Sequence, residues 1–210
     1  ILDPTSCPGT DTCKLGISSS RGVTGELRRH LRVVEDTLDP TVKGLHIKAS
    51  GCFNGCSQHH VADIGFLGIS RQVGGRKVPH FNMVLGGQWT ENAKSYGMVV
   101  GAIPSKNVPK AVELVTAHYV KNKKDGETFH DFIARVGKKD FRTTLAAVQA
   151  VPSYDEDKSF YSDWGDPREY SIGDIGIGEC AGEVISSTEL ELNAAEAEVF
   201  EAQVALEDGD

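Results

Sequence analysis

The chain has 210 residues, a net charge of −8, 23 glycines and five cysteines. No apolar run approaches the roughly 20 residues of a membrane-spanning helix, and no signal peptide opens the chain, so we expect a cytoplasmic protein without a membrane partner. The acidic total also argues against nucleic acid as a partner. The chain begins at Ile1 and a motif follows almost at once, which predicts a fragment of a longer protein.

The charge is distributed unevenly along the chain. Residues 1–150 carry 20 bases and 13 acids, whereas residues 151–210 carry 17 acids and two bases, Lys158 and Arg168. A chain of this length fits one ordinary domain plus an appendage. We therefore expect a basic domain over residues 1–150 and an acidic extension over residues 151–210.

The first half of the chain reads mainly as strands. Residues 1–22 form a polar loop, in which residues 18–22 either bind an anion or simply lead into a helix. Thr24 is predicted to cap that helix and Asp39-Pro40 to end it. Gly74-Gly75 and Gly86-Gly87 mark turns. Alternating or short apolar runs predict four strands, at residues 45–49, 61–67, 79–85 and 96–103.

A helical section follows the strands. One helix is predicted to begin near Asn107, with Pro109 in its first turn. Thr128 is predicted to cap a second helix that Gly137 stops, and Phe141 marks a third. Strands followed by helices indicate an α+β fold.

The acidic extension has weaker signals. Trp164 is expected to anchor it to the body. Residues 176–181 match G-x-G-x-x-A, but no strong strand precedes them, so we interpret them as a loop. Ser186 and Glu189 form a capping box for a final amphipathic helix, whose apolar stripe needs a partner surface. The fifth cysteine, Cys180, is interpreted as a structural or accessible thiol.

Four of the cysteines lie in the first quarter of the chain, in two tight pairs. Cys7 and Cys13 form Cys-x5-Cys; 39 positions later, Cys52 and Cys56 form Cys-x3-Cys among glycines. Four thiolates on glycine-rich loops suit an iron–sulfur cluster. Structural zinc, disulfides and inert thiols are the alternatives. The spacing fits a zinc knuckle poorly, the lack of a secretion signal weakens disulfides, and tight pairing is unusual for inert thiols.

These motifs resemble a known family. Cys-x5-Cys followed by Gly-Cys-x-Asn-Gly-Cys is similar to the cluster signature of the sirohaem-containing nitrite and sulfite reductases. The likeness continues through Gln58, residues 61–68 and residues 81–87, and covers about residues 5–148. It is strongest to the ferredoxin-linked assimilatory members. The resemblance implies a mixed sheet with helices of the sirohaem-cluster domain type.

The resemblance also implies a set of cofactor ligands. The cysteines that would hold a 4Fe–4S cluster are Cys7, Cys13, Cys52 and Cys56. In the family the last cysteine bridges to the sirohaem iron, a role that falls to Cys56 here. Asn54 would lie against the macrocycle, and Gly51 and Gly55 would let backbone N–H groups approach the cluster sulfurs.

The implied reaction is six-electron reduction of nitrite to ammonia or of sulfite to sulfide, with a donor such as ferredoxin. The anion-binding Arg and Lys residues of the family come largely from an N-terminal half. We therefore assign no catalytic residue, and we expect this chain alone to be inactive. His59-His60 follows the bridging cysteine; interpreted as part of a strand, only one of the two could face the site. The alternative functions are an iron–sulfur electron-transfer module without sirohaem and a redox-inert zinc domain.

Overall fold

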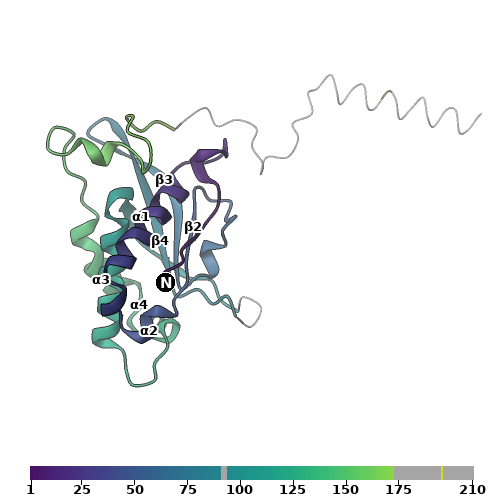
Figure 1. Ribbon diagram of the computed structural model, residues 1–210, viewed down its shortest axis with the longest axis vertical. Helices are drawn as coiled ribbons and strands as arrows, with labels where there is room; N and C mark the ends of the chain where they lie inside the picture. The colour runs from purple at the N-terminus through teal and green to yellow at the C-terminus, as the bar shows by residue number, and fades with distance from the viewer. Residues whose placement is uncertain (91–93, 173–194, 196–210) are drawn as a thin grey trace, which may run out of the picture. The chain divides into compact units, whose positions relative to one another are not determined.

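A computed structural model describes residues 1–90, 94–172 and 195 of the chain (Figure 1). In this part of the chain one five-stranded mixed sheet has the order β1-β2-β3-β4-β5. The first three strands run parallel, and the last two are added antiparallel. The strands are β1 (Thr5–Ser6), β2 (Ile47–Ser50), β3 (Ile64–Val73), β4 (Arg76–Leu85) and β5 (Met98–Pro104).

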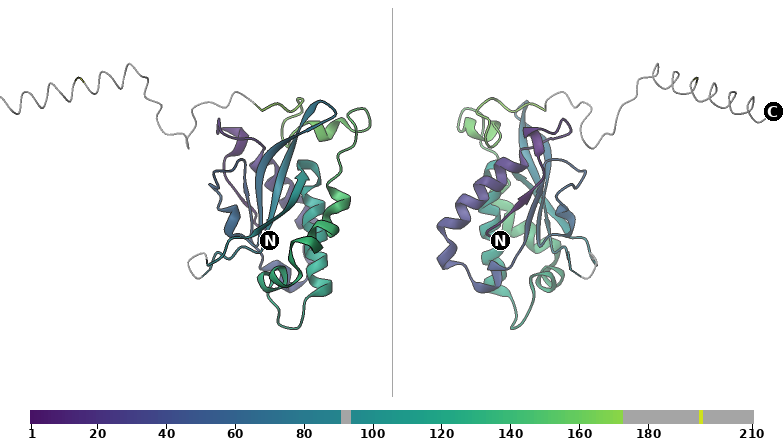
Figure 2. Two further views of the ribbon diagram at one scale, coloured as in Figure 1. Left: turned by 180° about the vertical axis from the view of Figure 1, so that it is seen from behind. Right: turned by 45° about the vertical axis from the view of Figure 1, so that its right-hand side comes forward.

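The helices lie on one face of this sheet (Figure 2). The α-helices are α1 (Ser20–Val33), α2 (Pro40–Lys43), α3 (Val108–Asn122) and α4 (Phe129–Leu145). Short 3-10 turns occur between the strands and helices and after α4: η1 (Gly9–Asp11), η2 (Glu35–Thr37), η3 (His59–Val61), η4 (Ser105–Asn107), η5 (Ala146–Val148) and η6 (Lys158–Tyr161). A mixed sheet covered by helices confirms the predicted α+β class.

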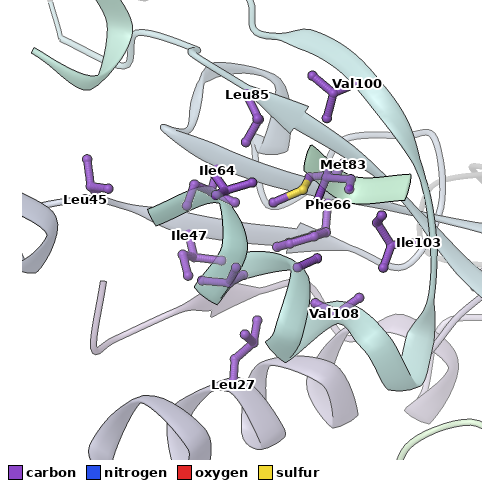
Figure 3. Packing of buried hydrophobic residues seen from close by; sticks show 14 of the residues in the cluster. Leu27, Leu45, Ile47, Ile64, Phe66, Met83, Leu85, Val100, Ile103 and Val108 are labelled. Atoms are coloured by element: carbon purple, nitrogen blue, oxygen red, sulfur yellow. The ribbon is translucent and has the colours of Figure 1, made fainter. Parts of the chain in front are cut away.

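The core lies between the sheet and the helices (Figure 3). Alternate residues of β4 point into it, because successive side chains of a strand face opposite sides. Phe81, Met83 and Leu85 are fully buried there, and Leu27 of α1 and Val108 of α3 close the layer from the helical side. The predicted turn at Gly74-Gly75 joins β3 to β4, with positive φ angles of 56° and 83° that favour glycine.

Two helix boundaries differ from prediction. The cap of α1 is Ser19, whose hydroxyl accepts the N–H of Gly22 at 3.1 Å, whereas Thr24 lies inside the helix and donates to Ser20 O. The apolar stripe fixes the face of a helix but not its first turn, so a serine run just upstream decides the start. Asp39 does not end this helix, because it caps α2 through Thr41 N.

Gly137 stops the helical geometry as predicted. Its φ of 75° interrupts α4, so the predicted second and third helices follow one another across a kink.

The chain divides into two compact units, Ile1–Gly176 and Ile177–Asp210. Residues 151–172 therefore belong to the first unit, beyond the boundary that the charge pattern suggested at residue 150. The G-x-G-x-x-A match, Cys180, the capping box and the final amphipathic helix fall outside the described residues. Among the described residues, no helix is long and apolar enough to cross a membrane.

Candidate iron–sulfur site

Two adjacent parallel strands bring the cysteine pairs together. Cys7 directly follows β1, and Cys52 follows β2 after one glycine. Ser6 pairs with Ala49, so the carboxyl ends of both strands meet at the same edge of the sheet. The N–H of Cys7 donates to Ala49 O at 3.2 Å and extends this pairing by one residue. Cys7 and Cys52, 45 positions apart in sequence (52 − 7), thus lie on neighbouring loops.

Two neighbouring groups hold the Cys7 side chain and backbone. The N–H of Gly51 donates to Cys7 Sγ at 3.2 Å. The hydroxyl of Ser20 donates to Cys7 O at 2.9 Å and lies 3.4 Å from Cys7 Sγ. Backbone N–H groups aimed at sulfur favour a negatively charged thiolate and orient it, which is what a metal-binding cysteine needs.

The other three cysteines influence the ionisation of Cys52. Burial raises the pKa of the Cys52 thiol, the N–H of Asn54 opposes this, and nearby Cys7, Cys56 and Cys13 raise the pKa further. The influence of all three other cysteines places the four sulfurs in one region. The raised pKa keeps the Cys52 thiol protonated when no cation is bound, and iron binding would remove that proton.

Close backbone packing explains the glycines around the cysteines. A Cβ added at Gly51 would lie 2.8 Å from both Gly9 Cα and Ser18 O, so no side chain fits there. Gly9 and Gly55 have positive φ angles of 61° and 72°, which favour glycine at both positions. The glycines thus allow the two loops to meet and the Gly51 N–H to reach sulfur.

A cluster and a single metal ion place different demands on the four thiols. Within the part of the chain that the structure describes, no three Cys, His, Asp or Glu side chains are arranged to hold one metal ion. A tetrahedral zinc site draws its sulfurs to about 2.3 Å from a single centre. A cube of four irons instead binds each sulfur at a separate corner, so its ligands lie farther apart. Four thiolates on adjoining loops are the donor set that a 4Fe–4S cluster takes, so the residues present fit such a cluster.

The second cysteine pair has one buried and one exposed member. Cys52 is buried, whereas Cys56 is exposed, together with Phe53, Asn54 and Gln58 of the same loop. Phe53 is 76% exposed, which is unusual for a large apolar side chain. Cys56 and Asn54, the residues predicted to face sirohaem, therefore lie on the outer side of the cysteine group.

The adjacent histidines do not lie on a strand. They form η3, so the argument that strand alternation points them to opposite faces was wrong. His59 is buried, with Nδ1 2.9 Å from Ser50 Oγ, and Ser50 Oγ lies 2.6 Å from Ser57 Oγ. His60 is half-buried and packs its ring edge-on against Tyr96. His59 thus braces the loop between β2 and Ser57.

Stability should fall in acid because His59 is buried. Burial, and secondarily the charge of His60, lowers the pKa of His59 from 6.5 to about 4. Since the folded protein prefers neutral His59, its contribution to stability is complete above pH 6.5 and is lost as pH falls through 4. Between about pH 7 and pH 4.5 we expect His59 to account for about 2 kcal/mol of lost unfolding free energy.

Urea unfolding of the metal-free chain at the two pH values measures this loss. His59→Asn places an amide near the position of Nδ1 and does not titrate, so its acid-induced loss should be smaller than that of the wild type. His60→Asn is the matched control and should keep the wild-type loss. If the unfolding free energy fell equally in all three proteins, protonation of His59 would not be the cause of the acid-induced loss.

The serine run is structural rather than anion-binding. Ser18 Oγ donates to Ile69 O and His80 O, Ser19 caps α1, and Ser20 donates to Cys7 O. Arg21 pairs with Asp11 at 3.9 Å. Of the two interpretations of residues 18–22, the structure supports the one in which they lead into the helix.

A cavity of about 760 Å³ lies at the other end of β2 and contains no cysteine. His46 and Asp63 on its wall are within 3.2 Å of each other, and the His46 ring packs on Trp89. His46 and Asp63 thus satisfy each other, and no cysteine lines this cavity.

Comparison with known proteins decides the family. The family model described as "Nitrite and sulphite reductase 4Fe-4S domain" matches residues 1–150. The chain belongs to this family. Membership and the named relatives confirm the predicted cofactors, a 4Fe–4S cluster and sirohaem. The residues that hold each cofactor stay predictions.

Relatives include both nitrite and sulfite reductases. An assimilatory ferredoxin-dependent nitrite reductase of Haloferax mediterranei is 27% identical over 132 residues, which are 63% of this chain and 22% of the relative. A sulfite reductase [ferredoxin] of Mycolicibacterium paratuberculosis is 31% identical over 144 residues, covering 65% of this chain and 25% of the relative. The solved NirA protein of Mycobacterium tuberculosis matches with a TM-score of 0.56 and 27% identity, over 67% of this chain and 26% of NirA. The chain spans about a quarter of the length of these relatives.

Proposed function

We propose that this chain is the cluster-carrying part of a nitrite or sulfite reductase, with Cys7, Cys13, Cys52 and Cys56 as cluster ligands. The observation that supports this best is the parallel pairing of β1 with β2. It places both cysteine pairs at one sheet edge, with the Gly51 N–H 3.2 Å from a cysteine sulfur. Family membership supplies the identity of the cofactors.

The chain's own residues would hold and tune the cofactors. When bound, the cluster and sirohaem supply electrons and an iron centre for six-electron reduction of nitrite to ammonia or of sulfite to sulfide. The N–H groups of Gly51 and Asn54 point at Cys7 and Cys52 sulfur, where they favour the electron-rich state. Cys56 is exposed on the outer side of the group, where a thiolate can be shared with sirohaem.

Asn54 and Phe53 lie beside Cys56 on the same exposed loop. We place Asn54 against the macrocycle, with Phe53 as an apolar contact next to it. Gly55, between Asn54 and Cys56, takes a positive φ that turns the chain between them. This loop would therefore form the sirohaem-facing wall that the chain contributes.

Substrate and donor follow from the relatives by analogy. We propose a small anion, nitrite or sulfite, as substrate and a ferredoxin-like protein as electron donor, since two relatives are named as ferredoxin-dependent. The basic groups that bind the anion are proposed to lie in the remaining three quarters of a relative-sized protein. No Arg or Lys of this chain is assigned to catalysis.

Anaerobic reconstitution of the purified chain with iron, sulfide and sirohaem tests the proposal. We expect bound iron and inorganic sulfide in cluster stoichiometry, a cluster absorption spectrum, and no viologen-driven reduction of nitrite or sulfite. Binding of zinc in place of iron–sulfur would overturn the cluster assignment. A cluster that never couples to sirohaem, even in a full-length protein containing this chain, would favour a simple electron-transfer module. Robust turnover by the chain alone would overturn the view that it is only one part of the enzyme.

A further inference from the structure

Residues 151–172, which we call the strap, lie across a cavity from the loop that carries Cys7 and Cys13. The strap lies beyond the part of the chain that the family model matches. It runs at the same end of the sheet as that loop (Figure 2). A cavity of about 450 Å³ separates them, lined by Thr10–Thr12, Cys13, Lys14 and Gly16 on one side and by strap residues such as Asp166 and Tyr170 on the other. The strap thus lines the same cavity as Cys13, a proposed cluster ligand.

Asp163 connects the strap to the start of α1. Its Oδ2 accepts the N–H of Ser19 at 2.7 Å, and its Oδ1 accepts the hydroxyl of Ser105 at 3.0 Å and the N–H of Trp164 at 2.8 Å. The side chain is buried, so water cannot easily replace these donors. Asp163 therefore fixes Ser19, the neighbour of the Ser20 that contacts Cys7.

Trp164 holds the strap against η4 and against α1. Its indole N–H donates to Ser105 O at 2.9 Å, and Lys106 Nζ lies 4.1 Å from the ring centroid. A Cβ added at Gly22 would come within 2.6 Å of Trp164 Cβ, so strap and helix are in direct contact. These contacts confirm that Trp164 anchors the described part of the extension, residues 151–172, to the body.

Tyr170 forms a second connection, on the other side of the serine run. Its hydroxyl donates to Ile17 O at 2.5 Å. The N–H groups of Ile17 and Ser18 donate to Gly51 O at 2.8 and 3.0 Å, and the Gly51 N–H donates to Cys7 Sγ. Tyr170 thereby orients the peptide between Ile17 and Ser18. That segment in turn orients Gly51, whose N–H contacts Cys7 Sγ.

We propose that Asp163 and Tyr170 are positioning residues for Cys7, acting through residues 17–20 and Gly51. The strap holds those residues from both sides, at Ser19 and at Ile17, and they in turn hold the backbone and sulfur of Cys7. The inference rests on the proposed function for the cluster itself, but the positioning of Cys7 by the strap is also measurable without a cluster.

Tyr170→Phe removes one hydroxyl and keeps the buried ring. In the reconstituted full chain we expect cluster loss to a chelator to accelerate about fivefold, the factor that one lost hydrogen bond corresponds to. The reduction potential should become more negative, because a less well-placed Gly51 N–H stabilises the electron-rich cluster less. In the metal-free chain at alkaline pH, where the labelling rate reports access to sulfur rather than the thiolate fraction, Cys7 should react about fivefold faster with iodoacetamide. Mass spectrometry of the labelled peptide measures this rate.

Tyr154→Phe is the matched control. Tyr154 lies in the same strap, and its ring packs against Arg76 and Tyr161 rather than against residues 17–20. It should leave cluster loss, potential and Cys7 labelling at wild-type values. Asp163→Asn is the second test variant. Its amide N–H₂ replaces one carboxylate oxygen and would face groups that themselves donate, the Ser19 N–H or the Ser105 hydroxyl and Trp164 N–H. It should therefore repeat the effects of Tyr170→Phe.

The outcomes separate the two proposals. If the wild type holds no cluster, the proposed function fails and Cys7 labelling alone decides the strap's role. If the Tyr170→Phe and Asp163→Asn variants match the Tyr154→Phe control in Cys7 labelling and, where a cluster forms, in potential, the positioning role is overturned. A change in thermal unfolding with no change at Cys7 would show a merely structural strap and would also overturn it.

Discussion

Replacing Cys52 by serine is expected to abolish assembly of the iron–sulfur cluster. Cys52 is the buried member of its pair, and the other three cysteines are near enough to raise the pKa of its thiol. A serine hydroxyl is a poor ligand for iron in such a cluster because it is harder and far less acidic than a thiol. After anaerobic reconstitution we expect bound iron and sulfide to fall by more than about tenfold relative to the wild type.

The matched control for this experiment is Cys180→Ser. Cys180 belongs to neither cysteine pair, so its loss should leave iron and sulfide content unchanged. Circular dichroism of both variants before reconstitution verifies that the metal-free chains are equally folded. A Cys52→Ser protein that retains the full cluster would remove Cys52 from the ligand set.

Local patterns in the sequence were sufficient to predict the cysteine pairs and most strands. The two cysteines of each pair lie within a few residues of each other, and the alternation of Phe81, Met83 and Leu85 directly reflects which face of β4 packs into the core. Gly74-Gly75 likewise requires a turn through its own backbone preference. Such features depend on neighbours in sequence, so one chain is enough to infer them.

Features that depend on distant partners could not be predicted. β1 has only two residues, and it exists because β2, more than 40 positions away, provides its hydrogen-bonding partner. The role of Asp163 depends on a hydrogen bond to Ser19, 144 positions away, and nothing in the local sequence distinguishes it from the other acids of the tail. His59 was misplaced on a strand because a single 3-10 turn leaves no periodic signal.

Gly68 of β3 provides the second large effect, because it lies against the backbone that carries the second cysteine pair. A Cβ at this position would overlap Gly51 O and lie 2.7 Å from Gly51 C and 3.1 Å from Ser18 Cβ. A backbone carbonyl cannot rotate away as a side chain can, and Gly51 O also accepts the N–H groups of Ile17 and Ser18. Gly68→Ala must therefore push the Gly51 loop off the sheet edge or break those two hydrogen bonds.

We expect Gly68→Ala to lower the unfolding free energy by about 3 kcal/mol and to reduce cluster incorporation in parallel. Gly25→Ala is the control, because Gly25 lies within α1 and an added Cβ meets nothing within 4 Å. That substitution should stabilise the chain by about 0.5–1 kcal/mol, since alanine favours a helix over glycine. Denaturant unfolding measures both. A Gly68→Ala protein that is as stable as wild type and still holds the cluster would contradict this prediction. It would mean that the contact between β3 and Gly51 does not fix the two cysteine loops against each other.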